Sequence, residues 1–251
     1  MKVSIITATK NQGHFLESNL QSIKEQNYSN IEHIIVDSCS DDQTKEIVGK
    51  NREKINKYIC EEDQGIYEGI NKGIKAASGD IIAVLNVDDI YVDEQVISDV
   101  VRSFKENDTD SVYGDLVYVD KENIDKVTRY WRAGLGDRAK ISVGWMPPHP
   151  ALFIKKEIYQ EYGCYNTDFK ISADYEIILR FLYMHRITMS YMHRLCVKMR
   201  IGGVSNRSLF SMLKKSYEDY KACKIYGIKK PRRVVAWKNF QKLPQFLKKN
   251  H

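Results

Sequence analysis

Acidic residues follow two apolar runs in the first part of this 251-residue chain. Asp37 ends the run 31–36, and Asp88 and Asp89 follow the run 80–85. Ligands of open α/β sheets bind beyond the carboxyl ends of the strands, and adjacent side chains on an extended backbone point in opposite directions. A divalent cation beside phosphates needs only one or two protein carboxylates, so this pattern predicts a metal and phosphate site. The alternative is that Asp88 or Asp89 only caps a helix beginning near Tyr91.

A third acidic position lies in the second half of the chain. Ser172 is a good N-cap, which places Asp174 in the first turn of a helix, and apolar residues follow it by three, four and seven positions. Asp174 is therefore a candidate general base, which the helix N-terminus and a nearby metal are expected to keep ionised. The alternative is that it only stabilises the helix dipole. Glu176 points about 200° around the helix from Asp174 and is expected to face solvent.

Strand and helix patterns alternate over about the first 110 residues, which predicts an α/β fold with a mostly parallel sheet flanked by helices. Strands are predicted at 3–6, 31–36, 57–60 and 80–85, and helices at 11–26, 41–48, 66–77 and 92–104. The later pattern is mixed, with a strand at 111–119 and a partner after it, a loop at 130–150, helices at 155–161, 172–184 and 209–225, and a strand pair at 188–199.

Charge divides the chain into two parts. Residues 205–251 carry 13 Lys and Arg against two acids, whereas residues 1–204 carry 26 against 31. We therefore expect a catalytic domain at 1–205, with a nucleotide-sugar-binding half at 1–110 and an acceptor half at 111–205, followed by a helical basic extension at 206–251.

The five cysteines lack metal-ligand spacing and are expected to be free thiols. No signal peptide is visible, and no apolar run approaches the roughly 20 residues of a membrane span.

Two phosphate-binding loops are absent from the sequence. No Gly-x-Gly-x-x-Gly follows the first predicted strand, and no Gly-x-x-x-x-Gly-Lys-Ser/Thr occurs anywhere. Dinucleotide binding and nucleoside-triphosphate hydrolysis through those loops are therefore disfavoured.

Six segments, in order, resemble inverting family-two glycosyltransferases of the GT-A fold, over residues 3–205. They are VSIITATKN at 3–11, IIVDSCSDDQT at 34–44, DQGIYEGINKGI at 63–74, NVDD at 86–89, HPALF at 149–153 and ISADYE at 171–176. The third resembles a subgroup found in bacterial surface-polysaccharide gene clusters. Ala8 and Lys10 depart from the usual first motif, and Asn86 replaces a frequent acid, so the metal is expected to be held with fewer protein charges.

The resemblance implies a role for each motif. It assigns nucleotide binding to Thr7, Thr9, Asp37 and Asp88, metal binding to Asp89, and general-base catalysis to Asp174. His149 is either a further ligand near the metal or diphosphate, or a packed loop residue between prolines. Gly202, Gly203 and Ser205 form either a flap over the donor diphosphate or a turn before the next helix.

These assignments predict an enzyme that moves a sugar from a nucleoside-diphosphate donor, with a UDP-sugar favoured, to a hydroxyl of a glycan or lipid-linked saccharide. A Mn²⁺ or Mg²⁺ ion would stabilise the leaving diphosphate, and one base opposite it would give inversion. The product would serve cell-surface polysaccharide synthesis. Two alternatives remain: a sugar-nucleotide nucleotidyltransferase, and a non-catalytic glycan- or partner-binding module with a GT-A-like fold.

The basic segment 229–251 interleaves Lys and Arg with aromatic and aliphatic residues. Such a segment is typical of an interface with anionic lipid, which would make the protein cytoplasmic and peripheral on the inner face of the cytoplasmic membrane. The alternative is a solvated tail. Nucleic-acid binding is disfavoured because no recognised module accompanies the charge.

Overall fold

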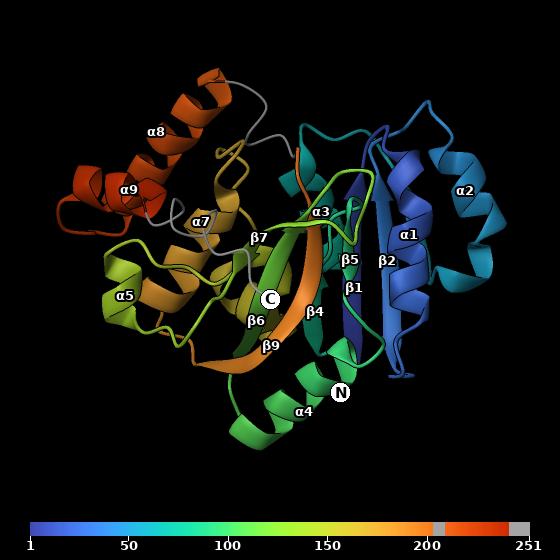
Figure 1. The fold of residues 1–251 in the computed structure, drawn as a ribbon, viewed down its shortest axis with the longest axis horizontal. Coiled ribbons are helices and arrows are strands. Elements are labelled where there is room, and N and C mark those ends of the chain that lie inside the picture. The colour runs from blue at the N-terminus through green and yellow to red at the C-terminus, as the bar shows by residue number, and fades with distance from the viewer. Residues whose placement is uncertain (203–208, 241–251) are drawn as a thin grey trace.

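The computed structural model describes residues 1–202 and 209–240, which fold around one mixed sheet (Figure 1). Its first part has four parallel strands in the order β3-β2-β1-β4. These are β1 (Val3–Thr9), β2 (Ile31–Asp37), β3 (Lys57–Cys60) and β4 (Ile81–Val84). The predicted α/β alternation is confirmed, because each of these strands lies where an apolar run predicted it.

The second part of the sheet is mixed. β8 (Leu152–Lys155) lies between β4 and β6 (Ser111–Val119) and is antiparallel to both. β6 also pairs with β7 (Val127–Trp131) and, in parallel, with β9 (Met189–Arg200), which pairs with β5 (Asp89–Tyr91). The whole order is β3-β2-β1-β4-β8-β6-β9-β5, so both halves of the chain share one continuous sheet.

Helices cover both faces of the sheet. α3 (Ile66–Ala76), α5 (Arg138–Ser142), α6 (Lys156–Tyr162) and α7 (Ala173–Ile178) belong to the core cluster that contains Ile6. α1 (Gly13–Lys24), α2 (Thr44–Lys50) and α4 (Val96–Asn107) build the opposite side, where α1 and α4 pack with Ile5. Ile5 and Ile6 contribute to different clusters because successive side chains of a strand point to opposite faces. Short 3₁₀ turns lie at Arg52–Lys54 and His149–Ala151, and a π-helical turn, Leu179–Met184, continues α7.

Two helices form the described part of the predicted C-terminal extension, α8 (Leu209–Ile225) and α9 (Pro231–Phe240). They lie on the α7 side of the molecule (Figure 1). Val234 and Val235 of α9 are buried, and the carbonyl oxygen of Val234 lies only 3.1 Å from where a Cβ on Gly144 would be. Gly144 also has a φ of +100°, so glycine suits both the close approach and the backbone conformation.

Two sequence predictions of local structure are wrong. The segment 188–199 is a single strand, β9, rather than a strand pair, because it runs beside β6 over most of its length. The helix expected near Tyr91 begins only at Val96, because Tyr91 belongs to β5 and pairs with Val197.

Candidate active site

Asp37 is fully buried at the end of β2, and both of its carboxylate oxygens accept hydrogen bonds. Oδ1 accepts from the backbone N–H of Ser40 at 2.9 Å and from the Ser40 hydroxyl, and Oδ2 accepts from the Tyr58 hydroxyl at 2.6 Å. Burial and this hydrogen bond raise the pKa of Tyr58, so it remains a donor at neutral pH. Asp37 therefore holds together the loop after β2 and the adjacent strand β3.

Asp88, predicted to bind the nucleotide, lies on the turn between β4 and β5, and Asp89, predicted to bind the metal, is the first residue of β5. Asp89 is fully buried; its Oδ2 accepts from the Asn86 amide at 3.0 Å, and its Oδ1 has no hydrogen-bond partner. Burial, and then the charge of Asp88, raise the pKa of Asp89 well above its usual range. Asn19 of α1 fixes the turn, because its amide donates to the carbonyl oxygens of Asn86 and Asp89 at 3.0 and 2.9 Å.

This turn fits a divalent cation. A cation would satisfy the unpartnered oxygen of Asp89 and relieve the repulsion between Asp88 and Asp89. Within residues 1–202 and 209–240, no group of three or more His, Cys, Asp or Glu side chains is arranged to hold a metal. The remaining ligands would therefore be donor phosphate oxygens and water, which is the usual arrangement for Mg²⁺.

Arg200, at the end of β9, is a site residue that the sequence analysis missed. Its guanidinium donates to the carbonyl oxygen of Asp88 at 2.8 Å and to the Ser18 hydroxyl at 3.1 Å, and it lies 5.0 Å from the centre of the Phe15 ring. Its Nε is buried without a hydrogen-bond partner. The available signal was a basic residue directly after the strand pair predicted at 188–199 and two residues before Gly202.

The two threonines of β1 differ in their surroundings. The Thr7 hydroxyl lies 3.1 Å from His33 Nε2 and 3.4 Å from Asn19 Oδ1, so it is engaged inside the protein. The Thr9 hydroxyl is buried near the end of the strand and has no hydrogen-bond partner. The Thr9 hydroxyl can thus still donate and accept a hydrogen bond, whereas the Thr7 hydroxyl already has partners within the protein.

Asp174 lies in the first turn of α7, as predicted, with Ser172 at the N-cap position. Its Oδ1 accepts from the backbone N–H of Tyr175 at 2.8 Å and makes a long contact of 3.5 Å with the Tyr67 hydroxyl. Burial raises its pKa, but the charge of Lys215, then His149 in its protonated form, the charge of Lys238 and the hydrogen bond from the Tyr175 N–H together outweigh burial, so the net pKa of Asp174 is lowered. Asp174 is therefore ionised at neutral pH, as a base must be.

His149 lies on the Asp174 side of the site. Its Nε2 is 2.6 Å from the Tyr165 hydroxyl. Burial lowers the pKa of His149, and the charge of Asp174 partly opposes this shift. Tyr165 in turn stacks on Tyr67, with ring centres 5.7 Å apart. Tyr67, which contacts Asp174, is thus linked through Tyr165 to His149.

The motif at 63–74 connects the two halves of the site. Tyr67 donates to the carbonyl oxygen of Ile171 at 2.8 Å, just before α7. Asn71 makes two hydrogen bonds with the backbone of Tyr165, at 2.8 and 2.9 Å. Helix α3 of the first half therefore orients both the start of α7 and the Tyr165 loop.

Three side chains of α8 and α9 support α7, and the sequence analysis missed them. Glu218 accepts backbone N–H groups at 170, 171 and 172, at 3.1, 2.8 and 2.9 Å. Lys238 forms a buried ion pair with Asp219 at 2.9 Å and lies 3.3 Å from the centre of the Tyr175 ring. Glu218 and Asp219 are the two acids of the basic segment 205–251, and that isolation was the available signal.

Glu176 does not face solvent, so that prediction is wrong. Its side chain is buried, forms an ion pair with Arg180 at 3.1 Å and accepts a hydrogen bond from Tyr226. The expected exposure fails because α8 and the chain after it cover the outer side of α7.

Of the predicted flap residues, Gly202 is exposed with a φ of +108°, whereas Gly203 and Ser205 lie outside the described residues.

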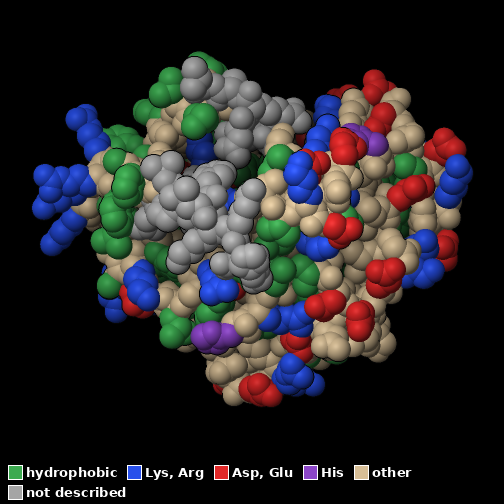
Figure 2. All heavy atoms as spheres, viewed as in Figure 1, with side chains coloured by type: hydrophobic (Ala, Val, Ile, Leu, Met, Phe, Trp, Pro, Cys, Tyr) green, Lys and Arg blue, Asp and Glu red, His purple; other side chains and the backbone are tan. Residues whose placement is uncertain are grey.

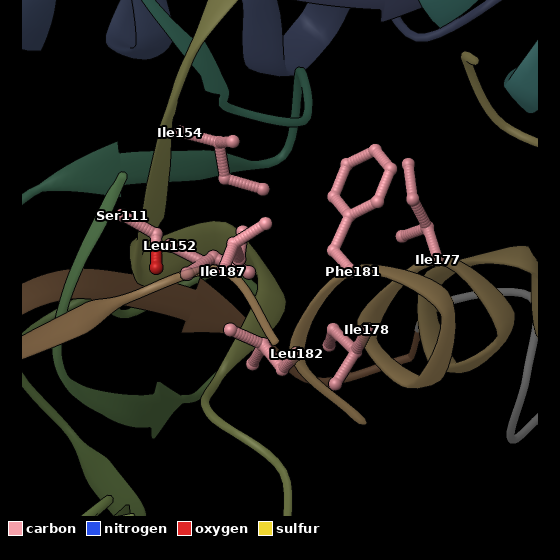
Figure 3. Close-up of a pocket in the computed structure, with 8 residues that line it drawn as sticks. All are labelled: Ser111, Leu152, Ile154, Ile177, Ile178, Phe181, Leu182 and Ile187. Atoms are coloured by element: carbon pink, nitrogen blue, oxygen red, sulfur yellow. The ribbon is translucent and has the colours of Figure 1, made fainter. Parts of the chain in front are cut away.

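A small apolar pocket lies beneath α7, between this helix and the sheet (Figure 3). Ile177, Ile178 and Phe181 line it from the helical side, and Leu152 and Ile154 line it from β8. The predicted apolar face of this helix is thus confirmed. The pocket offers no charged group and serves to pack the helix that carries Asp174.

Tyr118, near the end of β6, connects the two predicted carboxylate sites. Burial is the main cause of its raised pKa; Arg129 opposes the shift, and the charges of Asp89 and Asp174 both add to it. Both carboxylates therefore act on one tyrosine of the shared sheet. The α/β sheet, with Asp37 and Asp89 at strand ends and Asp174 on the helix α7, has the organisation expected of a GT-A fold.

The model of the family "Glycosyl transferase family 2" matches residues 4–169, and the chain belongs to this family. It is thus a nucleotide-sugar-dependent glycosyltransferase, which sets aside the nucleotidyltransferase and the non-catalytic module considered above. A "PGL/p-HBAD biosynthesis glycosyltransferase" of Mycobacterium bovis is 26% identical over 208 residues, covering 81% of this chain and 78% of that protein. An uncharacterized glycosyltransferase of Mycobacterium tuberculosis is 28% identical over 179 residues, covering 71% and 68%.

Solved structures share the fold. S. aureus TarS 1–349 in complex with UDP-GlcNAc has a TM-score of 0.67 at 17% identity, covering 91% of this chain and 66% of that one. The mannosyltransferase PcManGT from Pyrobaculum calidifontis, in complex with GDP-Man and Mn²⁺, has a TM-score of 0.67 at 18% identity, covering 98% and 73%. At these identities the likeness establishes the fold alone.

Proposed function

We propose that this protein is an inverting, metal-dependent transferase that moves a sugar from a nucleoside-diphosphate donor, with UDP favoured, to a hydroxyl of a glycan or lipid-linked saccharide in cell-surface polysaccharide synthesis. The observation that carries the proposal is the position of Asp174 in the first turn of α7, 3.5 Å from the hydroxyl of Tyr67, which stacks on Tyr165. TarS binds UDP-GlcNAc and PcManGT binds GDP-Man, which supports a nucleotide-sugar donor.

In the proposed reaction, Asp174 takes the proton of the acceptor hydroxyl while that oxygen attacks the anomeric carbon. Tyr67, held by its stacking on Tyr165, packs against the acceptor and orients it. Arg200 adds positive charge next to the leaving diphosphate. A divalent cation held by Asp88 and Asp89 would supply Lewis-acid stabilisation of that diphosphate. A single displacement with one base inverts the anomeric configuration.

The donor site is tested by calorimetric titration of UDP and GDP with Mn²⁺ and with EDTA. We expect Asp89→Asn to lose the gain in affinity that Mn²⁺ gives, and Asp37→Asn to bind more weakly while keeping that gain. Asp125→Asn is a matched control, because this aspartate is exposed and pairs with Lys198. Equal affinity of the unmodified protein in Mn²⁺ and in EDTA would refute the metal site.

We further propose that α8 and α9 place the protein on anionic lipid. Among the described residues, no helix is both long and apolar enough to cross a bilayer. Instead, large apolar side chains are exposed on both helices, among them Phe210 (76%), Leu213 (70%) and Trp237 (50%). Figure 2 shows such side chains beside Lys and Arg on this side of the molecule. Exposed apolar groups with surrounding cations are typical of a membrane interface.

Part of α9 is buried, which limits the residues through which this surface can be tested. Val234, Val235 and Lys238 are buried and cannot contact lipid, and truncation after Gly227 would remove them from the core. We therefore compare Leu213→Ser/Trp237→Ser with Val127→Ser, an exposed apolar residue on β7. The unmodified protein and Val127→Ser should sediment with anionic liposomes but not with neutral ones. The double variant should no longer sediment with anionic liposomes. Unchanged sedimentation of the double variant would exclude this surface.

A further inference from the structure

Two exposed cysteines lie next to each other at the Asp37 end of the sheet. The Sγ atoms of Cys39 and Cys60 are 3.7 Å apart. Cys60 is the partner of Asp37 in the parallel register of β2 and β3, and Cys39 lies two residues beyond Asp37. By contrast, Cys196 and Cys223 are buried, and Cys164 is only partly exposed.

The separation of the two sulfurs suits a disulfide. A disulfide bond is about 2.05 Å long, so the sulfur atoms need to approach by less than about 2 Å. Both thiols are open to a dissolved oxidant. Cys39 has a φ of +52°, and in this backbone conformation its side chain already lies beside Cys60 at the end of β3.

The same two segments hold Asp37. Ser40, directly after Cys39, donates to Asp37 Oδ1, and Tyr58, two residues before Cys60, donates to Asp37 Oδ2. Cys60 Sγ itself is 4.0 Å from Asp37 Oδ2. The Ser38 hydroxyl accepts from the backbone N–H of Asp63 at 3.3 Å, at the start of the motif that leads to α3. Pulling Cys39 and Cys60 together must therefore move groups that position Asp37.

We propose that Cys39 and Cys60 are a modification site, at which a reversible disulfide forms and weakens nucleotide binding at Asp37. The nucleotide part rests on the proposed function, in which Asp37 takes part in binding the nucleotide of the donor. With glutathione disulfide as oxidant, one cysteine thiolate attacks it and releases one glutathione thiolate. The second cysteine thiolate then attacks the mixed disulfide and releases the other. The protein loses two electrons and two protons, and one glutathione disulfide becomes two glutathione thiols.

The hydrogen bond shared with Cys60, followed by burial and the charge of a Cys60 thiolate, raises the pKa of Cys39. Since the thiolate is the reacting form, exchange should become faster as the pH rises above neutrality.

The first measurement is intact mass and peptide mapping after incubation with glutathione disulfide. We expect the unmodified protein and Cys164→Ser to lose two hydrogen atoms and yield a peptide linked through Cys39 and Cys60. Cys39→Ser and Cys60→Ser should instead retain a glutathione adduct on the remaining thiol of the pair. Glutathione adducts without an internal disulfide in the unmodified protein would overturn the proposal.

The second measurement compares UDP affinity of the reduced and oxidised protein by calorimetry, with GDP in parallel. We expect oxidation to weaken binding about tenfold and dithiothreitol to restore it. Because coupling is reciprocal, saturating UDP should lower the equilibrium constant for oxidation by the same factor. Equal UDP affinity in both states would overturn the link to Asp37. If the reduced protein binds neither UDP nor GDP, the proposed function fails instead, and the disulfide mapping still decides whether the pair forms.

Discussion

The carboxylate of Glu218 lies 2.9 Å from the backbone nitrogen of Ser172, the residue at which the helix of Asp174 begins. The same carboxylate accepts two preceding backbone N–H groups. An acid in the C-terminal part of the chain thus holds the segment that orients the predicted base.

Glu218→Gln should test this positioning role. The amide keeps one acceptor oxygen but cannot accept all three N–H groups, so α7 loses part of its anchor. We expect the transfer rate to fall about tenfold, as a positioning defect of a base does, while donor Kd stays unchanged. Glu157→Gln on α6, which is exposed, is the matched control. If Glu218→Gln lost donor binding as well as transfer rate, the variant would have a general folding defect rather than a positioning defect.

Asp174→Asn should remove the basic carboxylate while keeping the shape of the side chain. Loss of a general base typically costs about 10²- to 10⁴-fold in rate. Donor Kd, measured by calorimetry, should stay close to that of the unmodified protein, because the donor residues lie on other elements. Transfer at an almost unchanged rate would assign the proton acceptor to another residue.

The ion pair of Lys238 with Asp219 should contribute to stability only as a pair. Removing one partner leaves a buried charge, which typically costs about 3–5 kcal/mol, whereas replacing both avoids that penalty. We expect Lys238→Met and Asp219→Asn each to lower the free energy of unfolding, and the double variant to recover much of the loss. Urea unfolding measures this, with Lys229→Met as an exposed control. Additive losses in the double variant would contradict a coupled pair.

Stability should fall between pH 7 and 5 because of His33. Burial lowers the pKa of His33 to about 3, so below about pH 6.5 the unfolded chain binds a proton that the folded protein does not. By pH 5 this difference in bound protons lowers the free energy of unfolding by about 2 kcal/mol. Glu32 titrates at lower pH: burial raises its pKa, but hydrogen bonds from Ser4 and Ser78 outweigh burial and bring it to about 2.

Urea unfolding at several pH values should therefore show a smaller pH dependence for His33→Gln than for the exposed control His14→Gln. Part of the dependence should persist, because burial also lowers the pKa of His149. An identical pH dependence in the two variants would mean that His33 does not couple protonation to folding.

Local patterns were sufficient to predict the first half of the fold. Alternating apolar runs and helical faces identify β1 to β4 and α1 to α3, because each element buries a periodic face. The position of Asp174 in the first turn of α7 was predictable from Ser172 for the same local reason.

Contacts between distant segments were not predictable from the sequence. Asp174 was expected to be kept ionised by the helix N-terminus and a metal, yet Lys215 and Lys238 from the C-terminal helices contribute positive charge. Glu176 was expected in solvent because its helix was considered alone, without α8 and the chain after it. Tertiary packing decides both cases, and no spacing within a single segment encodes it.

The insertion of β8 between β4 and β6 has a consequence for how such enzymes can be recombined. A chimera that joins residues 1–110 of this protein to the second half of a relative must also match a foreign β8 to the edge of β4, where Ile82 pairs with Ile154. A mismatch along that seam would leave backbone groups of β4 unpaired in the interior. Exchange of an exposed segment, such as residues 120–126 between β6 and β7, leaves the seam intact and is the exchange that the fold should tolerate better.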